Sequence, residues 1–309
     1  MDEADSVEAR CAAHERIMDG GRFEAGTVFG EWRLTAFIGR GGSGEVYCAE
    51  HVRIGIPAAV KVLVRDDERA KGRFEREAKI LSSLKSSAFP RFFAYGEANG
   101  VPYLVMELLQ PGDLPSDDRA VAAFMLKVCG VVAELHALGL VHRDIKPSNI
   151  LWRTGRTGAS PVREQNPVLA DLGLVKSISS TPSIRLDDSL SIIDGQRVGV
   201  GTPGYGAPEQ MERGEATIAS DIHALGVLAD RCFGGNPPRQ WQRIIQRATS
   251  SILAYRYMTI AEFAHDIRWR NLWRNVAIGV LIVFLVGLLI DILVLAGLTA
   301  AAIAIWQYA

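Results

Sequence analysis

The sequence predicts an α+β protein with a strand-rich N-terminal part, a helix-rich C-terminal part and one transmembrane helix. Three observations predict this architecture. Apolar residues alternate in short runs broken by glycine from Trp32 to about Ile56. Later segments show helical spacing instead. A stretch of about 31 residues from Val276 carries one charge, and a membrane span needs only about 20 apolar residues.

The strands and helices can be placed one by one. The runs "WRLTAFIG", "GEVYCAEH", "AAVKVLV" and "VPYLVMELL" are typical of strands. The run "DERAKGRFEREAKILSSL" has helical spacing, with Phe74, Ala78, Leu81 and Leu84 along one face. A second helix, "AVAAFMLKVCGVVAELHALG", ends at Gly139. Residues 1–30 are expected to form a poorly structured leader.

Composition excludes several classes of protein. The formal net charge of −1 argues against a broad nucleic-acid-binding surface, so we expect no nucleic-acid partner. The four cysteines are scattered and form no C-x-x-C pair, which favours reduced thiols over disulfides or a zinc site. They are Cys11, Cys48, Cys129 and Cys232.

A glycine-rich sequence, "FIGRGGSGEVY", places Gly39, Gly41 and Gly44 at the spacing G-x-G-x-x-G. A dinucleotide-binding fingerprint with this spacing opens a helix. Here the residues that follow Gly44 continue into a strand, which favours a strand–loop–strand flap over phosphates.

Lys61 lies among apolar neighbours in the middle of a predicted strand. Such a lysine usually faces solvent, but Glu77 lies near the apolar stripe of the following helix. A buried lysine needs a carboxylate to remain charged. We therefore predict a Lys61–Glu77 pair that directs the ammonium toward phosphate oxygens.

The string "LVHRDIKPSNIL" contains H-R-D-x-K-x-x-N, "LADLGL" places Asp171 before a glycine, and "VGTPGYGAPEQ" contains A-P-E. Together with the glycines and Lys61, this ordered set resembles the motifs of eukaryotic-type (bacterial Hanks-type) serine/threonine protein kinases. The resemblance covers about Trp32 to Ile267. It implies a bilobal fold, with an N-lobe of antiparallel sheet plus one helix and a helical C-lobe, followed by a membrane anchor.

The resemblance also implies catalytic and metal-binding roles. Asp144 would accept or orient the proton of the substrate hydroxyl, and Lys146 would offset charge on the transferred phosphoryl group. Asn149 and Asp171 would bind Mg²⁺ or Mn²⁺. Lys146 and Thr202 occupy positions typical of the serine/threonine class.

ATP is the implied cosubstrate. Met106 would border the adenine pocket, and two residues after it would offer backbone groups to the base. The residues expected to bind ATP are Ile38, Gly39, Gly41, Gly44, Val46, Lys61, Glu77, Glu107 and Leu109.

Three further residues have structural roles by the same resemblance. His142 would pack the catalytic loop, Asp221 would hold that loop from below, and Arg256 would pair with Glu209.

Arg143 could bind a phosphate on the segment from Asp171 to Glu209, where we expect autophosphorylation. The alternative is a merely solvated loop. The candidate residues there are Ser177, Ser179, Ser180, Thr181, Ser183, Ser189 and Ser191.

Arginines precede the apolar stretch and no Lys or Arg follows it, so the positive-inside rule predicts a single pass through the cell membrane with the kinase domain in the cytoplasm. Asp291 interrupts the stretch. It could support a homodimer, mark the end of a shorter span, or mark the turn of a helical hairpin; we favour one pass.

The expected divisions are a leader (1–30), a kinase domain (31–268, with lobes 31–108 and 109–268), a basic juxtamembrane segment (269–275) and a transmembrane segment (276–306).

Two regions depart from the family pattern. Arg153 to Pro167 lengthens a hairpin and is expected to form a surface loop. After Asp221 the chain reaches its last helices early, so one helix that usually helps to dock substrates is expected to be reduced.

The expected partners are protein substrates and membrane lipid. The first alternative function is a pseudokinase-like, membrane-bound scaffold. A kinase-fold enzyme acting on small molecules is a further alternative.

Overall fold

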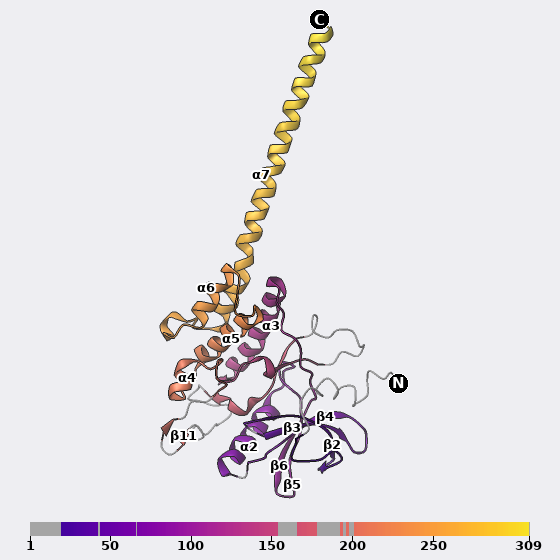
Figure 1. The fold of residues 1–309 in the computed structure, drawn as a ribbon, viewed down its shortest axis with the longest axis vertical. Helices are drawn as coiled ribbons and strands as arrows, with labels where there is room; N and C mark the ends of the chain where they lie inside the picture. The colour runs from indigo at the N-terminus through magenta and orange to yellow at the C-terminus, as the bar shows by residue number, and fades with distance from the viewer. Residues whose placement is uncertain are drawn as a thin grey trace. The chain divides into compact units, whose positions relative to one another are not determined.

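A computed structural model describes residues 20–42, 44–65, 67–153, 166–177, 192–193, 196–197 and 201–308 (Figure 1). The chain divides into two compact units, Met1–Ala264 and His265–Ala309. The first unit contains a sheet followed by a group of helices, which is the α+β arrangement that the sequence predicts.

The sheet has six antiparallel strands in the order β1-β2-β3-β4-β6-β5. Four of them were predicted. The short β1 and the strand β5 were not; β5 contains Gly96 and has no fully buried residue. The bounds are β1 Val28–Phe29, β2 Trp32–Gly41, β3 Gly44–His51, β4 Pro57–Val62, β5 Phe92–Ala98 and β6 Val101–Met106.

The two faces of the sheet are packed differently. One face forms the main core, which includes Leu34, Tyr47 and Val60. The opposite face carries a smaller cluster in which several members stay only half-buried. Because side chains alternate along a strand, Tyr47 and Val46 belong to different faces.

Helix α2, Glu68–Ser83, begins at Asp67, whose side chain accepts a hydrogen bond from the backbone of Ala70 at 2.8 Å. It buries Phe74, Ala78 and Leu81, as its spacing predicted. The same helix carries Glu77.

The remaining part of the first unit is mainly helical. Residues 107–117 join β6 to α3 without a helix between them, and residues 233–238 join α5 to α6. This short connection agrees with the early arrival of the last helices that the sequence predicts. The helices are α3 Asp118–Ala137, α4 Pro208–Arg213, α5 Ile218–Cys232 and α6 Arg239–Ala248, with 3₁₀ turns η2 Pro147–Asn149, η3 Leu172–Leu174 and η5 Leu253–Tyr255.

Short strand pairs frame the predicted catalytic segment. β7 pairs with β10, and β8 pairs with β9. A third pair joins β11 to β12. Their bounds are β7 Leu140–Val141, β8 Ile150–Leu151, β9 Val168–Leu169, β10 Lys176–Ser177, β11 Ile192–Ile193 and β12 Gln196–Arg197.

The expectation of a poorly structured leader over residues 1–30 is wrong for its last part. β1 pairs with β2, and Phe23 and Phe29 pack against the main core. Their rings meet edge to face at 5.0 Å. Aromatic burial of this kind stabilises a segment that charge patterns alone suggest is loose.

Helix α7, Ile260–Tyr308, is continuous. Its part Ile278–Gly297 has a mean hydropathy of 3.1, and none of its residues is buried. The helix runs through Asp291 without a turn, so the hairpin alternative is wrong. α3 is also long and apolar, but 44% of its most apolar 18-residue window is buried, as expected of a core helix.

Candidate active site

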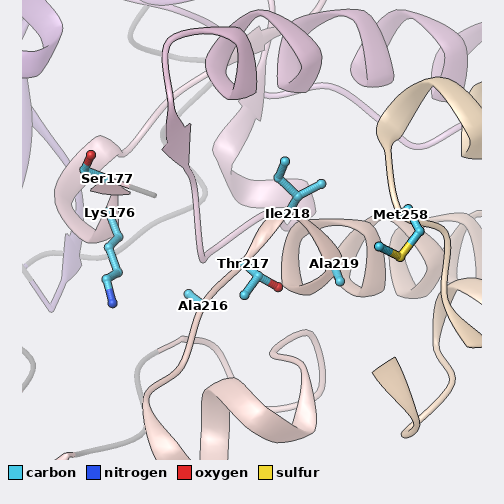
Figure 2. A pocket seen from close by; sticks show the side chains of 7 residues that line it. All are labelled: Lys176, Ser177, Ala216, Thr217, Ile218, Ala219 and Met258. Carbon is cyan, nitrogen blue, oxygen red and sulfur yellow. The ribbon is translucent and has the colours of Figure 1, made fainter. Parts of the chain in front are cut away.

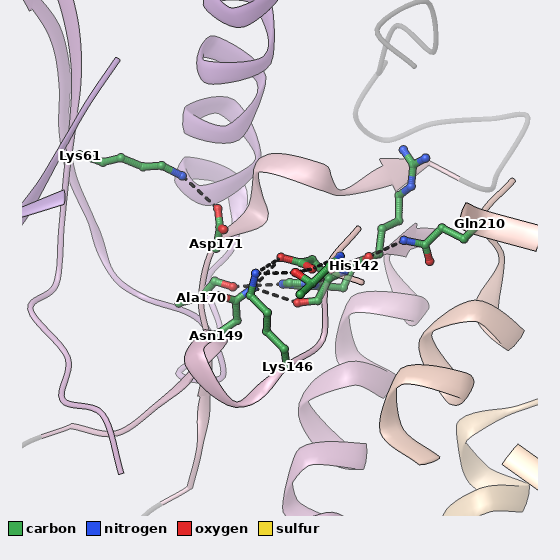
Figure 3. Close-up of polar contacts among 10 residues, drawn as sticks. Lys61, His142, Lys146, Asn149, Ala170, Asp171 and Gln210 are labelled. Carbon is green, nitrogen blue, oxygen red and sulfur yellow. Dashed lines mark hydrogen bonds and ion pairs between the residues drawn. The ribbon is translucent and has the colours of Figure 1, made fainter. Parts of the chain in front are cut away.

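Lys61 lies in β4, between Val46 of β3 and Leu104 of β6 in the strand register. Its side chain is 5% exposed. Its ammonium donates to Glu77 Oε1 at 2.6 Å and Oε2 at 2.8 Å, so the predicted pair is confirmed. It also donates to Asp171 Oδ1 at 3.0 Å, a second partner that the sequence did not indicate (Figure 3).

The opposite charges of Lys61, Glu77 and Asp171 shift one another's pKa values. Burial by itself lowers the pKa of Lys61, but the carboxylates of Asp171 and Glu77 outweigh it and raise that pKa above its usual value. Lys61 in turn lowers the pKa of Asp171 against the effect of burial. Burial raises the pKa of Glu77, yet its two hydrogen bonds from Lys61 keep it in the ion pair.

Asp171 has a left-handed backbone, with φ 58° and ψ 73°, immediately before η3. Its side chain is 37% exposed, unlike those of Lys61 and Glu77. In the described residues, positive φ outside glycine occurs only at Asn99, Arg143 and Asp171. Backbone strain of this kind gathers at functional sites, and two of these three residues belong to the predicted motifs.

Asp144 is the centre of a second polar group. Its Oδ1 accepts from the backbone N–H of Thr202 at 3.1 Å and from the Thr202 hydroxyl at 2.6 Å. Its Oδ2 lies 2.7 Å from the ammonium of Lys146, which also donates to the Thr202 hydroxyl at 2.7 Å. The structure therefore brings Asp144, Lys146 and Thr202 together, as expected for a serine/threonine-type site.

Asn149 completes this group from η2. Its amide nitrogen donates to the backbone oxygen of Asp144 at 2.8 Å and to its Oδ2 at 3.2 Å. The backbone N–H of Ala170 donates to the Asn149 carbonyl at 2.8 Å, which links Asn149 to the residue before Asp171. Because the amide nitrogen is engaged, the side-chain oxygen of Asn149 is the atom available as a metal ligand.

His142 is buried beneath the catalytic loop. Its Nδ1 accepts from the backbone N–H of Asp144 at 3.3 Å, so its Nε2 donates to the carbonyl of Ala170 at 3.1 Å (Figure 3). The ring thus joins the Asp144 segment to the Asp171 segment. This is the packing role that the sequence suggests.

Asp221 holds the same loop from α5, as predicted. Its carboxylate accepts from the backbone N–H of His142 at 2.8 Å and of Arg143 at 2.9 Å. His136, at the end of α3, lies 2.8 Å from the same carboxylate, and sequence reasoning missed it. Its place in the last turn of a helix that leads into the catalytic loop was the available signal.

Glu209 and Arg256 form the predicted buried pair. The guanidinium donates to the two carboxylate oxygens at 2.8 and 2.9 Å, and the Ser220 hydroxyl donates to one of them at 2.9 Å. Burial raises the pKa of Glu209, but the bonds from Arg256 and Ser220 outweigh it and hold the pKa below its usual value.

A small apolar cluster covers the half-buried face of the sheet. The predicted residues Ile38, Val46 and Met106 lie in it. Sequence reasoning missed Ala59, although it shares the face of Lys61 two residues away and pairs with Met106. The other members are Ala36, Cys48 and Leu108.

The three glycines of the glycine-rich sequence differ in what the fold requires. Gly44 has φ +145°, and a Cβ there would lie 2.3 Å from the carbonyl oxygen of Val62, so the protein itself requires glycine. Gly39 and Gly41 have no positive φ and nothing within 4 Å of a built Cβ. Their small size is available for the close approach of a ligand.

Glu107 lies directly after β6. Its backbone N–H donates to the carbonyl of Arg91, and its carboxylate receives two hydrogen bonds of 2.9 Å from Arg153. Arg153 also donates to the carbonyls of Ser87 and Phe89. The expectation that Arg153 belongs to a projecting loop is therefore wrong for this residue. Leu109, two residues after Glu107, is buried.

Arg143 is 6% exposed and donates to the carbonyl of Gly214 at 3.1 Å. Of the residues predicted for phosphorylation, Ser177 lies in β10; the others and most of the 154–167 loop lie outside the described residues.

A separate pocket of about 530 Å³ is lined by residues of β10 and the start of α5 (Figure 2). The lining residues are Lys176, Ser177, Ala216, Thr217, Ile218, Ala219 and Met258.

Comparison with known proteins matches residues 32–277 to the protein kinase domain. The chain is 32% identical to serine/threonine-protein kinase PknH of Mycobacterium tuberculosis (strain ATCC 25618 / H37Rv) over 225 residues, which are 69% of this chain and 33% of PknH. It is 32% identical to PknL of the same strain over 227 residues, 70% of this chain and 52% of PknL. The chain thus spans between a third and about half of these relatives.

Among solved structures, the kinase domain of Mycobacterium tuberculosis PknI is similar, with a TM-score of 0.57 and 22% identity. The similarity covers 80% of this chain and 99% of that one. At this identity the likeness concerns the fold.

Proposed function

Because the chain belongs to the protein kinase family, we propose that it is an ATP-dependent serine/threonine protein kinase that transfers the γ-phosphoryl group of ATP to hydroxyls of protein substrates. The observation that carries the proposal is the three-way contact of Lys61 with Glu77 and Asp171. It joins the sheet, helix α2 and the predicted metal ligand at one buried ammonium.

The half-buried cluster of Ile38, Val46 and Met106 is suited to the flat apolar adenine ring. Gly39 and Gly41 leave room for phosphates, which backbone N–H groups can bind. Lys61 pairs with Val46 of this cluster in the strand register, and its charge can stabilise phosphate oxygens. The carbonyl of Glu107 and the backbone of Leu109 are the proposed contacts for the base.

Asn149 and Asp171 offer an amide oxygen and a partly exposed carboxylate, which are the hard oxygen ligands that Mg²⁺ or Mn²⁺ prefers. The described residues contain no group of three or more His, Cys, Asp or Glu side chains that could hold a metal ion by themselves. This fits an ion whose other ligands are phosphates and water. When bound, the ion would neutralise charge on the phosphates.

Asp144 is the proposed site for the proton of the substrate hydroxyl. Thr202 binds its Oδ1, and Lys146 and Asn149 bind its Oδ2, so the orientation of the carboxylate is fixed before substrate arrives. Lys146 can then offset charge on the transferred group. Catalysis would rest on positioning and electrostatics, which suits phosphoryl transfer.

The span Ile278–Gly297 supports a single-pass membrane anchor with the kinase domain in the cytoplasm. Extraction of cell membranes with alkaline carbonate should leave the chain in the pellet. Asp291, within this span, is proposed to favour a homodimer, because a carboxyl group in lipid is costly without a partner. An unchanged crosslinked fraction in Asp291→Leu would remove that idea.

The activity is tested with the 309-residue chain in detergent micelles, incubated with Mg²⁺, γ-labelled ATP and casein. We expect phosphoserine and phosphothreonine on casein, and labelling of the chain itself between Asp171 and Glu209. Asp144→Asn is the matched control and should abolish both. A wild-type chain that labels nothing while binding ATP would favour the scaffold alternative.

A further inference from the structure

A buried carboxylate lies beside the glycine-rich sequence. Glu45 follows Gly44 directly, and its side chain is fully buried. It is not one of the residues proposed to bind ATP or metal. Burying a carboxylate is costly unless it is paired and hydrogen-bonded. The residues that bond to Glu45 therefore show what this carboxylate holds in place.

Two partners of Glu45 come from the sheet itself. Arg40, which lies between Gly39 and Gly41, donates from Nε to Glu45 Oε1 at 2.8 Å. The hydroxyl of Tyr47 bonds to the other carboxylate oxygen. Burial raises the pKa of Glu45, but bonds from Tyr47, Arg22 and Arg40 outweigh it and hold the pKa below its usual value. The carboxylate is therefore a charged anchor for the loop arginine.

The remaining partner comes from the segment that precedes the sheet. The backbone N–H of Arg22 donates to Glu45 Oε2 at 2.9 Å, and that of Phe23 donates to the Tyr47 hydroxyl at 3.1 Å. Arg40 in turn donates to the carbonyl of Gly20 at 3.3 Å. The segment Gly20–Phe23 is thus bonded to both strands of the glycine-rich loop.

Close packing accompanies these bonds. A Cβ on Gly21 would lie 2.7 Å from the Tyr47 hydroxyl oxygen and 2.9 Å from a ring carbon of Phe37. Glycine at this position lets the segment lie directly on the two rings. Any larger residue there must displace the segment or the rings.

The segment lies on the face opposite to the proposed nucleotide. Glu45 and Tyr47 alternate with Val46 and Cys48, and Tyr47 belongs to the main core, whereas Val46 belongs to the half-buried cluster. The segment can therefore affect a nucleotide only through the loop that it holds.

We propose that Gly20–Phe23 and Glu45 position the glycine-rich loop over the phosphates of ATP. The inference rests on the proposed function. Glycines leave a loop conformationally free, and fixing it beforehand lowers the entropy lost on binding. Through Arg40, the segment fixes the two glycines that the fold itself does not require.

The test uses a matched pair of substitutions in the 309-residue chain in detergent micelles. Arg22→Pro removes the backbone N–H that bonds to Glu45, and Arg22→Ala keeps it while removing the side chain. Arg22 has no positive φ, a conformation that proline cannot adopt. Dissociation constants for Mg-ATP and for adenosine, which has no phosphates, are measured by calorimetry.

We expect Arg22→Pro to weaken Mg-ATP binding by about tenfold, the value of one hydrogen bond to a charged group. Adenosine binding should be unchanged, and Arg22→Ala should bind both ligands like wild type. Equal losses for the two ligands, or no loss for either, would overturn the proposal.

Gly21→Ala provides a second measurement, because it keeps both backbone N–H groups. If Arg22→Pro shows no thermal unfolding transition and is therefore not folded, Gly21→Ala is the variant that tests the proposal. It should also weaken Mg-ATP binding selectively; an unchanged ratio of the two dissociation constants contradicts the inference. A wild-type chain that binds neither ligand would instead contradict the proposed function, so the two failures are distinguishable.

Discussion

Two buried ion pairs in this chain have similar chemistry but different surroundings. Arg256 makes four hydrogen bonds, two to Glu209 and two to the carbonyls of Ser250 and Ala219, and its side chain is fully buried. Lys61 makes three, to Glu77 and Asp171, and the second of these partners is 37% exposed. One pair is closed and the other opens toward solvent.

The difference indicates which pair serves stability and which serves chemistry. A planar guanidinium matches a carboxylate with two parallel bonds and leaves little freedom. An ammonium on a flexible stem can exchange one partner for a phosphate oxygen. Disrupting the closed pair should therefore unfold the domain, whereas disrupting the open pair should remove activity.

The largest expected effect is on the closed pair. Arg256→Met leaves Glu209 buried without its partner, which should lower the free energy of unfolding by about 3–5 kcal/mol. Urea denaturation of the full chain in micelles measures this. Arg33→Met removes an exposed pair with Glu50 and should cost at most about 1 kcal/mol. Equal losses in the two variants would contradict the distinction between buried and exposed pairs.

Lys61→Met should lower kcat by about 10²–10³, because it removes a preorganised positive charge from the phosphates. It should destabilise the fold less than Arg256→Met does. Burial already raises the pKa of Glu77, so this carboxyl can take up a proton when Lys61 is absent. Steady-state casein phosphorylation and urea denaturation are measured together; a variant with full activity and low stability would reverse our assignment of the two pairs.

Thr202→Val should have a smaller effect. It removes the hydroxyl that joins Asp144 to Lys146, and one hydrogen bond to a charged group is worth about tenfold in kcat/KM. Thr202→Ser, which restores the hydroxyl, should recover most of the activity. If valine and serine variants have the same kcat/KM, the hydroxyl does not position Asp144.

The smallest expected effect concerns pH. The folded-state pKa of Glu209 lies below its ordinary value of 4.5. Its stabilising contribution is therefore present above about pH 4.5 and is lost as the pH falls through the folded-state pKa. Wild type should lose more free energy of unfolding than Glu209→Gln over this acid range. Parallel stability curves for the two proteins would show that the pair is not the cause.

The family and the fold were predictable because their signals are local. Motif residues such as His142, Asp144 and Asn149 lie close together in one loop, and β2, β3, β4 and β6 are short, mainly apolar runs. The bonds of Asp221 and Arg256 followed from the family resemblance. These predictions are confirmed by the structure and the comparisons.

What the sequence did not reveal depends on contacts between distant residues. The bond of Lys61 to Asp171 spans 110 positions and that of Arg153 to Glu107 spans 46. The docking of Gly20–Phe23 depends on a buried carboxylate that looks like an ordinary surface glutamate in the sequence. Neither periodicity nor composition carries such information.

The most direct test of the account is the effect of Mg²⁺ on ATP affinity, measured by calorimetry on the full chain in micelles. Because Asp171 is assigned both to the metal and to Lys61, Mg²⁺ should tighten ATP binding in wild type and should not do so in Asp171→Asn, while adenosine affinity stays the same in both. Equal tightening by Mg²⁺ in the two proteins would contradict the convergence of Lys61, Asp171 and Asn149 on one metal-bound nucleotide.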